Sequence, residues 1–223
     1  MPADLALTTD ARWTADTAQL AAAAGTAGFA GIGLGAERTL AAAGQLAAAA
    51  AAVSAPWVLT VPAAPPSGES AALLRRCADV VAEAGARLAV EFSPLGVVTS
   101  IAAARELIAA ADPGRTAVMI DTWHFSRGDS TWADLAAIPL EEIAYLQVCD
   151  APAPRSGDGF DETMNRRCWP GEGTFELERF AAALLGRGWT GTVSVEVLNS
   201  DLVRLPVAEF ARVAHDTTAR YWG

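Results

Sequence analysis

Short runs of branched apolar residues alternate with alanine- and leucine-rich stretches along the whole chain. The runs with strand character lie at 4–8, 30–34, 57–61, 87–92, 116–121, 144–150 and 192–197. The stretches with helical character lie at 15–28, 37–53, 68–85, 100–111, 131–138, 175–188 and 206–221. Because a helix between two strands forms a right-handed crossover that leaves the strands parallel, the pattern predicts an α/β fold around a parallel sheet.

The number of strands bears on how such a sheet closes. About seven runs are present, whereas a complete TIM-type (β/α) barrel has eight strands. The helical stretch 37–53 runs almost directly into the strand at 57–61, where a unit is missing or vestigial. A barrel shortened to about seven strands and a barrel with an irregular segment in the gap both fit. Because 223 residues contain no linker-like segment, we expect a single barrel domain over residues 1–223.

The composition excludes several classes of partner. The 16 basic and 26 acidic residues give a formal net charge of −10, which argues against nucleic-acid binding because such binding needs a basic surface. Cys77, Cys149 and Cys168 show no CxxC spacing and are expected to be reduced thiols in a cytoplasmic protein. The N-terminal residues do not look like a secretory signal, and the apolar stretch 40–53 is too short to span a bilayer. We therefore expect no membrane association.

Polar side chains interrupt the apolar pattern near the carboxyl ends of the strands. At 88–92 the period of two sets Ala89 and Glu91 opposite the branched residues, which are expected to pack against helices. Polar residues then face the barrel axis, and the carboxyl ends of barrel strands are where active sites lie. Four successive strands each end with one such residue. These residues are Glu91, Asp121, Gln147 and Glu196.

Three carboxylates that meet at one end of a barrel repel each other strongly in a medium of low dielectric constant. Either their pKa values rise or a cation lies between them. Carboxylate oxygens together with the carbonyl oxygen of Gln147 form a donor set that suits a hard divalent ion such as Mg²⁺ or Mn²⁺. The sequence therefore predicts a metal site, and ordinary helix caps or salt bridges are the alternative for each residue taken alone.

Two further stretches carry reactive or ligand-binding side chains. His124 lies three residues after Asp121, in the loop expected above the strand ends, and Trp123 beside it can wall a pocket. The loop NRRCWPGEG at 165–173 presents Arg166 and Arg167, whose guanidinium groups can bind substrate oxygens. The alternative for these residues is simple packing or a solvated surface.

The motifs AVEFSP, MIDTWHF, LQVCD, NRRCWPGEG and VSVEV resemble, in order and spacing, those of the xylose isomerase-like TIM barrels. That superfamily includes sugar phosphate isomerases and epimerases, hydroxypyruvate isomerase, inosose dehydratase and 3-dehydroshikimate dehydratase. The resemblance extends over about residues 57–200. It departs from the family at Gln147, where the sugar epimerases usually have histidine, and at 151–163, where about a dozen residues are inserted.

The resemblance implies site residues by motif position. It implies that one divalent ion is held by Glu91, Asp121, Gln147 and Glu196. Mn²⁺ or Mg²⁺ is the expected ion, with Co²⁺ and Zn²⁺ as alternatives. It also implies that His124 is the histidine of the family's D-x-x-H motif and that Arg167, or its neighbour Arg166, binds substrate.

The implied activity is that of a metal-dependent isomerase or epimerase of a sugar, sugar phosphate or related hydroxy-keto compound. Glu91 or Glu196 would remove a proton next to a carbonyl, giving a metal-stabilised enediolate, and the other glutamate would return the proton with His124 assisting. Gln147 also fits a dehydratase of the 3-dehydroshikimate or inosose type. The missing unit fits a catalytically lapsed barrel that binds a ligand or another protein. By analogy with related barrels, we expect a homodimer.

Overall fold

The computed structural model describes residues 3–10, 12–13, 15–33, 40–155 and 157–222. The chain forms two compact units. The first unit comprises Met1–Gly35, Asp121–Ser126 and Leu146–Gly223, and the second comprises Ala36–Ile120 and Arg127–Tyr145. A single domain over residues 1–223 stays a prediction, and each unit is described by itself.

Seven parallel strands form the sheet within the described residues, in the order β2-β1-β7-β6-β5-β4-β3. Their bounds are β1 Asp4–Thr8, β2 Gly31–Gly33, β3 Trp57–Thr60, β4 Arg87–Glu91, β5 Thr116–Asp121, β6 Ile143–Val148 and β7 Thr192–Val195. The prediction of a parallel α/β sheet of about seven strands is thereby confirmed. Each strand lies within one or two residues of its predicted position, except that Leu34 of the predicted second strand lies outside the described residues.

Helices follow the strands as the alternation predicts. They are α1 (Thr17–Ala27), α2 (Leu40–Val53), α3 (Gly68–Glu83), α4 (Ile101–Ala111), α5 (Thr122–Arg127), α6 (Trp132–Ala137), α7 (Gly159–Asn165), α8 (Leu177–Leu185) and α9 (Val207–Trp222), with 3₁₀ turns η1 (Leu140–Glu142) and η2 (Leu202–Arg204). Residues 37–39, at the start of the predicted second helix, lie outside the described part. Two short helices were not predicted: α5 contains His124, and α7 forms within the insertion at 151–163.

Local chemistry explains where several helices begin. Asp16 precedes α1 and accepts the Gln19 backbone N–H at 2.8 Å, while the Gln19 side chain accepts the Asp16 N–H at 3.0 Å. This reciprocal capping satisfies donors that the first helical turn leaves without a partner. Ser67 and Ser70 cap α3 in the same way. In α3 the buried residues recur every three or four positions, so one face of the helix packs inward; they are Ala71, Leu74, Ala78 and Val81.

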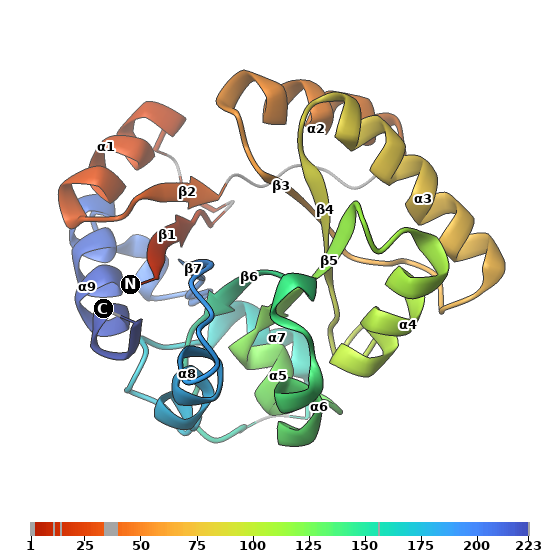
Figure 1. Ribbon diagram of the computed structural model, residues 1–223. Helices are drawn as coiled ribbons and strands as arrows, with labels where there is room; N and C mark the ends of the chain where they lie inside the picture. Colours follow the sequence, from red (N-terminus) through yellow and green to blue (C-terminus); the bar gives the residue numbers. More distant parts are fainter. Residues whose placement is uncertain (1–2, 11, 14, 34–39, 156, 223) are drawn as a thin grey trace. The chain divides into compact units, whose positions relative to one another are not determined.

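In the second unit, strand β4 lies between β3 and β5. Ala89 is the register partner of Leu59 on β3 and of Ala117 on β5, and Glu91 is the partner of Met119. The side chains on this face form a buried apolar cluster of Ala89, Ala117, Met119 and Ala144, against which Trp57, Leu59 and Tyr145 pack. Helices α2, α3 and α4 flank these strands (Figure 1). Both faces of β4 and β5 are therefore buried, as is typical of parallel sheets.

In the first unit, strand β1 lies between β2 and β7. Helices α1 and α9 pack side by side next to these strands (Figure 1). The Ala3 N–H donates to the Trp222 carbonyl oxygen at 3.2 Å, which ties the start of β1 to the end of α9. Trp222 is buried and contacts Trp189 and Phe180 edge to face. No helix in the described residues has both the length and the apolar character needed to cross a membrane.

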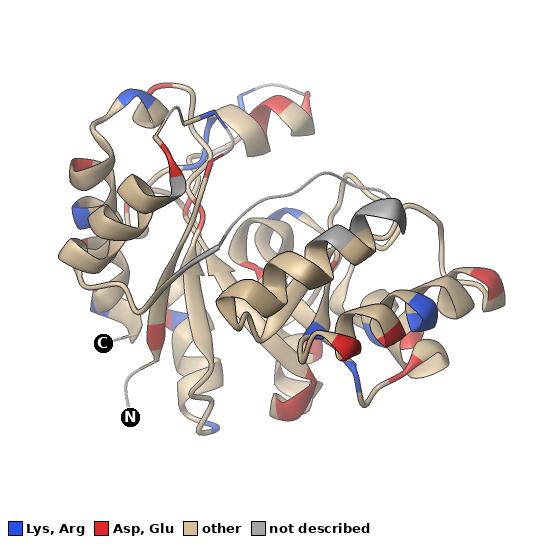
Figure 2. Cartoon of the chain, turned by 90° about the horizontal axis from the view of Figure 1, so that it is seen from above, with Lys and Arg blue, Asp and Glu red and all other residues tan. Residues whose placement is uncertain are grey.

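Charged residues are rare in the strands, which are mostly tan in Figure 2. The described strands contain only Asp4 and Arg87 at their starts and Glu91 and Asp121 at their carboxyl ends. A buried carboxylate is costly unless it is paired or binds a metal. The two strand-end carboxylates therefore mark the end of the sheet at which chemistry is to be sought.

Candidate active site

Three of the four predicted metal ligands belong to the first unit. Asp121 is the last residue of β5, Gln147 lies in β6, and Glu196 follows β7 directly. Gln147 is the register partner of Ser194, and the Glu196 N–H donates to the Val148 carbonyl oxygen at 3.1 Å. This pairing extends the β6–β7 ladder by one step, so the polar groups of Gln147 and Glu196 meet at the carboxyl ends of their strands.

A fully buried arginine joins two of these residues. The Arg167 Nη1 donates to the Asp121 carboxylate at 2.7 Å and to the Glu196 carboxylate at 3.1 Å. Its other nitrogens donate to Thr163 of α7, with Nε 3.1 Å from the carbonyl oxygen and Nη2 2.8 Å from the hydroxyl. Arg167 is only 2% exposed. The guanidinium charge is thus held between two carboxylates by hydrogen bonds on both of its sides.

Only one of the two polar atoms of the Gln147 side-chain amide has a hydrogen-bond partner among the described residues. Its Nε2 donates to Glu196 Oε1 at 3.1 Å, so each carboxylate oxygen of Glu196 accepts a hydrogen bond, one from Gln147 and one from Arg167. The Gln147 Oε1 is buried and has no hydrogen-bond partner among the described residues. A buried carbonyl oxygen left in this state is destabilising unless a cation or a ligand donor meets it. The donor set therefore fits a hard metal ion.

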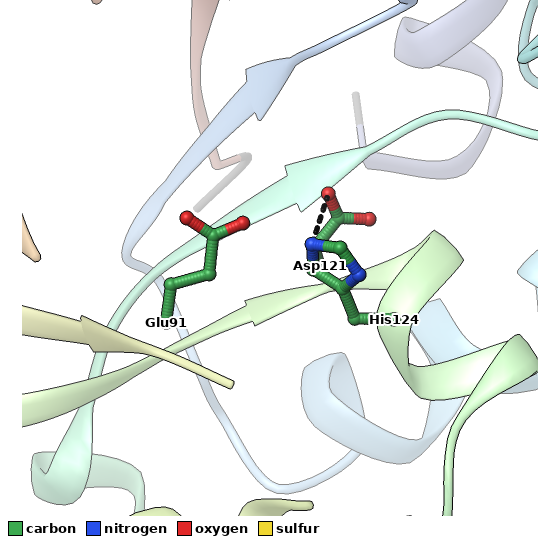
Figure 3. A group of neighbouring side chains, drawn as sticks. All are labelled: Glu91, Asp121 and His124. Carbon is green, nitrogen blue, oxygen red and sulfur yellow. Dashed lines mark ion pairs between the residues drawn. The ribbon is translucent and has the colours of Figure 1, made fainter. Parts of the chain in front are cut away.

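Asp121 is held as a carboxylate. Its Oδ1 accepts the Trp123 backbone N–H at 2.6 Å, and His124 Nε2 lies 3.8 Å from its Oδ2, the ion pair dashed in Figure 3. Burial alone would raise the pKa of Asp121, but the positive charge of Arg167, aided by His124 and the hydrogen bonds, lowers that pKa below its ordinary value. Because Trp123 and His124 lie in α5, they are fixed by a helix turn and not by the loop we expected.

Trp123 and Cys149 complete the surroundings of Arg167. The Arg167 guanidinium carbon lies 5.7 Å from the centre of the Trp123 ring, and Nη1 lies 3.6 Å from the Cys149 sulfur. Burial raises the pKa of the Cys149 thiol far above its usual range, although Arg167 opposes this shift. The thiol is therefore neutral. Trp123 and Cys149 wall the buried cation and exclude water from it.

Arg166 and Arg167 have different partners, although they are adjacent in the sequence. Its guanidinium pairs with Glu162 of α7 and borders a pocket of about 410 Å³. The pocket is lined by Pro152, Arg155, Asp161, Asn165, Arg166, Cys168, Asn199, Ser200 and Asp201. Burial and nearby acidic residues raise the pKa of Cys168 to about 12, so that thiol is also neutral. Of the two predicted substrate arginines, Arg166 therefore meets this polar pocket and Arg167 meets the carboxylates.

Glu91 belongs to the second unit, where it is the half-buried last residue of β4. Its register partner Met119 precedes Asp121 by two residues on β5. Side chains two positions apart on a strand share a face, so Met119 and Asp121 project from the same face of β5. Figure 3 draws Glu91 together with Asp121 and His124.

Two buried polar residues of the first unit, Thr163 and Asp150, were not found from the sequence. Thr163 lies in the insertion at 151–163, which carried no recognised motif, and only its place in α7 brings it to the guanidinium. Asp150 ends the LQVCD motif and is 1% exposed. An aspartate at the end of an apolar strand-like run was a usable signal, because a charge at such a position needs partners once it is buried.

Residues 15–217 match the family model described as the xylose isomerase-like TIM barrel. The 3-dehydroshikimate dehydratase of Pseudomonas aeruginosa is 32% identical over 62% of this chain and 22% of that protein. The inosose isomerase of Halalkalibacterium halodurans is 28% identical over 76% of this chain and 62% of that protein. The chain thus spans less than two thirds of either relative.

A solved structure of the IolI protein with a bound zinc atom shares the fold. It superposes with a TM-score of 0.73 at 21% identity, covering 82% of this chain and 70% of that chain. The predicted TIM-barrel class is therefore confirmed.

Arg167→Met should destabilise the first unit strongly. The variant leaves the Asp121 and Glu196 carboxylates buried without their cation, a change that costs about 3–5 kcal/mol in comparable buried pairs. Urea unfolding at neutral pH measures the difference. Arg179→Met is the control, because Arg179 forms an exposed pair with Glu176, and such pairs contribute at most about 1 kcal/mol. Equal losses in the two variants would contradict the role given to Arg167.

The stability lost in Asp121→Asn should depend on pH. The folded pKa of Asp121 lies below the unfolded value of about 3.9, so the ionised side chain stabilises the fold above that value. This contribution is lost as the pH falls from the unfolded pKa toward the folded pKa. We expect the difference in unfolding free energy between wild type and variant to be largest at neutral pH and to shrink below about pH 4. A difference that stays constant in urea titrations down to about pH 3 would refute the assignment.

Proposed function

The chain belongs to the xylose isomerase-like TIM-barrel family, and from that premise we propose that it is a divalent-metal-dependent isomerase or epimerase of a small polyhydroxylated keto compound. The observation that carries the proposal is the buried Asp121–Arg167–Glu196 cluster with the unsatisfied Gln147 carbonyl oxygen beside it. A buried carbonyl oxygen in this state, beside two carboxylates, offers a cation or a ligand donor a place to bind. The relative named inosose isomerase supports a cyclic polyol ketone as the substrate class.

The charges of the cluster support a divalent ion. Asp121 and Glu196 carry two negative charges and Arg167 carries one positive charge, so these three groups together are formally anionic. An anionic site favours a cation, and oxygen donors suit Mn²⁺ or Mg²⁺, with Co²⁺ and Zn²⁺ as alternatives. The zinc atom in the IolI structure supports a metal in this fold without deciding its identity here.

Glu91 is the proposed fourth ligand. Its strand register with β5 and the donor types of Glu91, Asp121 and His124 support this role (Figure 3). The ion, when bound, would supply Lewis-acid polarisation of a substrate carbonyl. Glu91 or Glu196 is the proposed base, and the other glutamate would return the proton. The buried imidazole of His124 would hydrogen-bond a substrate oxygen.

Arg166 and Trp123 are the proposed substrate contacts. Arg166 borders the polar pocket at the end of α7, where a guanidinium can bind hydroxyl or carboxylate oxygens. Trp123 offers an apolar wall at the buried side of the cluster. Arg167 is proposed to act on substrate through the carboxylates that it holds. The cytoplasmic location and the homodimer stay predictions.

A dehydratase is the second candidate. The relative named 3-dehydroshikimate dehydratase, 32% identical over 143 residues, and the glutamine at position 147 favour it. Removal of a proton next to a carbonyl is common to both reactions, and loss of a β-hydroxyl instead of reprotonation makes the difference. The same residues can serve either outcome.

Metal binding tests the proposed site directly. The wild-type protein is expected to bind one Mn²⁺ per chain, and Glu196→Gln should weaken binding by about tenfold or more because a charged ligand is replaced by a neutral one. Isothermal titration calorimetry and the electron paramagnetic resonance spectrum of Mn²⁺ measure this metal affinity without any substrate. Glu176→Gln is the control, since Glu176 is exposed on another helix turn. Absence of Mn²⁺, Mg²⁺, Co²⁺ and Zn²⁺ binding would favour a lapsed barrel.

Incubation in D₂O distinguishes the two reactions. Inosose-type ketones, ketoses and dehydroshikimate are each mixed with Mn²⁺-loaded protein. Deuterium incorporated at carbon without loss of water indicates an isomerase or epimerase, whereas a new conjugated chromophore indicates the dehydratase. Binding of the metal with neither outcome would contradict the proposed function.

A further inference from the structure

Asp150 is a buried charge outside the proposed ligand set. It lies two residues after the end of β6 and is 1% exposed. Its backbone forms an antiparallel bridge with Cys168: the Cys168 N–H donates to the Asp150 carbonyl at 2.7 Å, and the Asp150 N–H donates to the Cys168 carbonyl at 3.0 Å. Asp150 therefore touches the residue that directly follows Arg167.

The Asp150 carboxylate accepts three backbone hydrogen bonds, two of them from the segment 171–175. Oδ1 accepts the N–H of Phe175 at 2.9 Å and that of Ala151 at 2.8 Å, and Oδ2 accepts the N–H of Gly171 at 3.1 Å. A carboxylate offers acceptors on both oxygens, whereas an amide would set an NH₂ group against one of these donors. The ionised side chain is thus specifically suited to hold both ends of the segment 171–175.

Gly173 shows how closely this loop approaches Asp150. A Cβ atom at position 173 would lie 2.5 Å from the Ala151 carbonyl oxygen, 2.6 Å from the Ala151 nitrogen and closer still to Asp150 Oδ1. Backbone atoms cannot yield to such a contact, so a side chain at 173 would push the loop away. The glycine of the PGEG motif is therefore required by the Asp150 contact.

The segment 166–168 is fixed on its other side as well. The Arg167 N–H donates to the Leu198 carbonyl at 3.1 Å, and Asn199 Nδ2 donates to the Arg167 carbonyl at 2.7 Å. The backbone of Arg167 is thus clamped between the segments that follow β6 and β7. A long side chain reaches a fixed point only if its backbone is fixed, since rotamer freedom otherwise spreads its end over several ångströms.

We propose that Asp150 is a positioning residue of the site: by holding the loop 168–175 against the end of β6, it places the Arg167 guanidinium between Asp121 and Glu196. This inference rests on the proposed function for its catalytic meaning, because Asp121 and Glu196 are the proposed ligands. Its geometric content, the dependence of the Arg167 guanidinium on Asp150, can be measured without a metal.

The first experiment follows the Arg167 Nε–H by nitrogen-15 NMR, with the signal assigned by its loss in Arg167→Lys. In wild type this buried proton donates to Thr163 and should exchange slowly with water. Asp150→Asn is expected to speed its exchange by about tenfold or more. Leu184→Ala, a buried cavity variant in the same unit, controls for general destabilisation and should leave the signal in place at low temperature. An unchanged signal in Asp150→Asn overturns the inference.

Gly173→Ala covers the case in which Asp150→Asn does not fold. It keeps the carboxylate but displaces the loop, and it should speed Arg167 exchange in the same way. Gly25→Ala is its matched control, because no atom lies within 4 Å of the added Cβ. If Gly173→Ala folds and leaves the Arg167 signal unchanged, the proposed link between loop and guanidinium is wrong.

The second experiment connects the geometry to the site. In the wild-type background, Asp150→Asn should change the Mn²⁺ dissociation constant. In an Arg167→Met background, the same substitution should leave the Mn²⁺ dissociation constant unchanged, because the effects of coupled residues are not additive. Equal shifts in both backgrounds would overturn the proposal. If wild type binds no Mn²⁺ but the NMR result holds, the proposed function fails and the positioning role of Asp150 stands.

Discussion

The interaction on which the candidate site depends is the ion pair of one buried guanidinium with two buried carboxylates. Arg167 lies between Asp121 and Glu196, with Thr163 holding its far side. Burying any one of these charges alone would be prohibitively unfavourable. Removing one partner destabilises the fold more than replacing the whole set by apolar residues. Arg167 therefore allows two negative side chains, at the ends of β5 and β7, to be buried together without a metal. It also lowers the negative charge that a bound ion must balance.

The parallel sheet and the strand-end residues could be predicted from the sequence because they follow from periodicity. Branched residues every second position define a strand, and the carboxyl ends of parallel strands fall on one edge, so Asp121, Gln147 and Glu196 were placed correctly at strand ends. These features depend only on local pattern and on the geometry that all parallel sheets share.

Other features could not be predicted because they depend on tertiary contacts. His124 lies in α5, a helix too short for its own periodicity to be read. Helix α7 forms inside an insertion rich in glycine and proline, where Asp158 caps the first turn. Which of two adjacent arginines turns inward depends on the bridges of Arg166 with Asn199 and of Cys168 with Asp150. Those bridges join residues about 20 to 30 positions apart, and no local pattern encodes them.

The buried Arg167 guanidinium has a consequence for the order of folding and metal binding. Many small metalloproteins fold only when their metal arrives, since their ligands repel each other until it does. Here the arginine supplied by the chain itself already neutralises part of that repulsion. The polypeptide would therefore reach its native state without the proposed ion and bind that ion afterwards. Metal supply would then govern how many molecules are active, while the amount of folded protein would be independent of it.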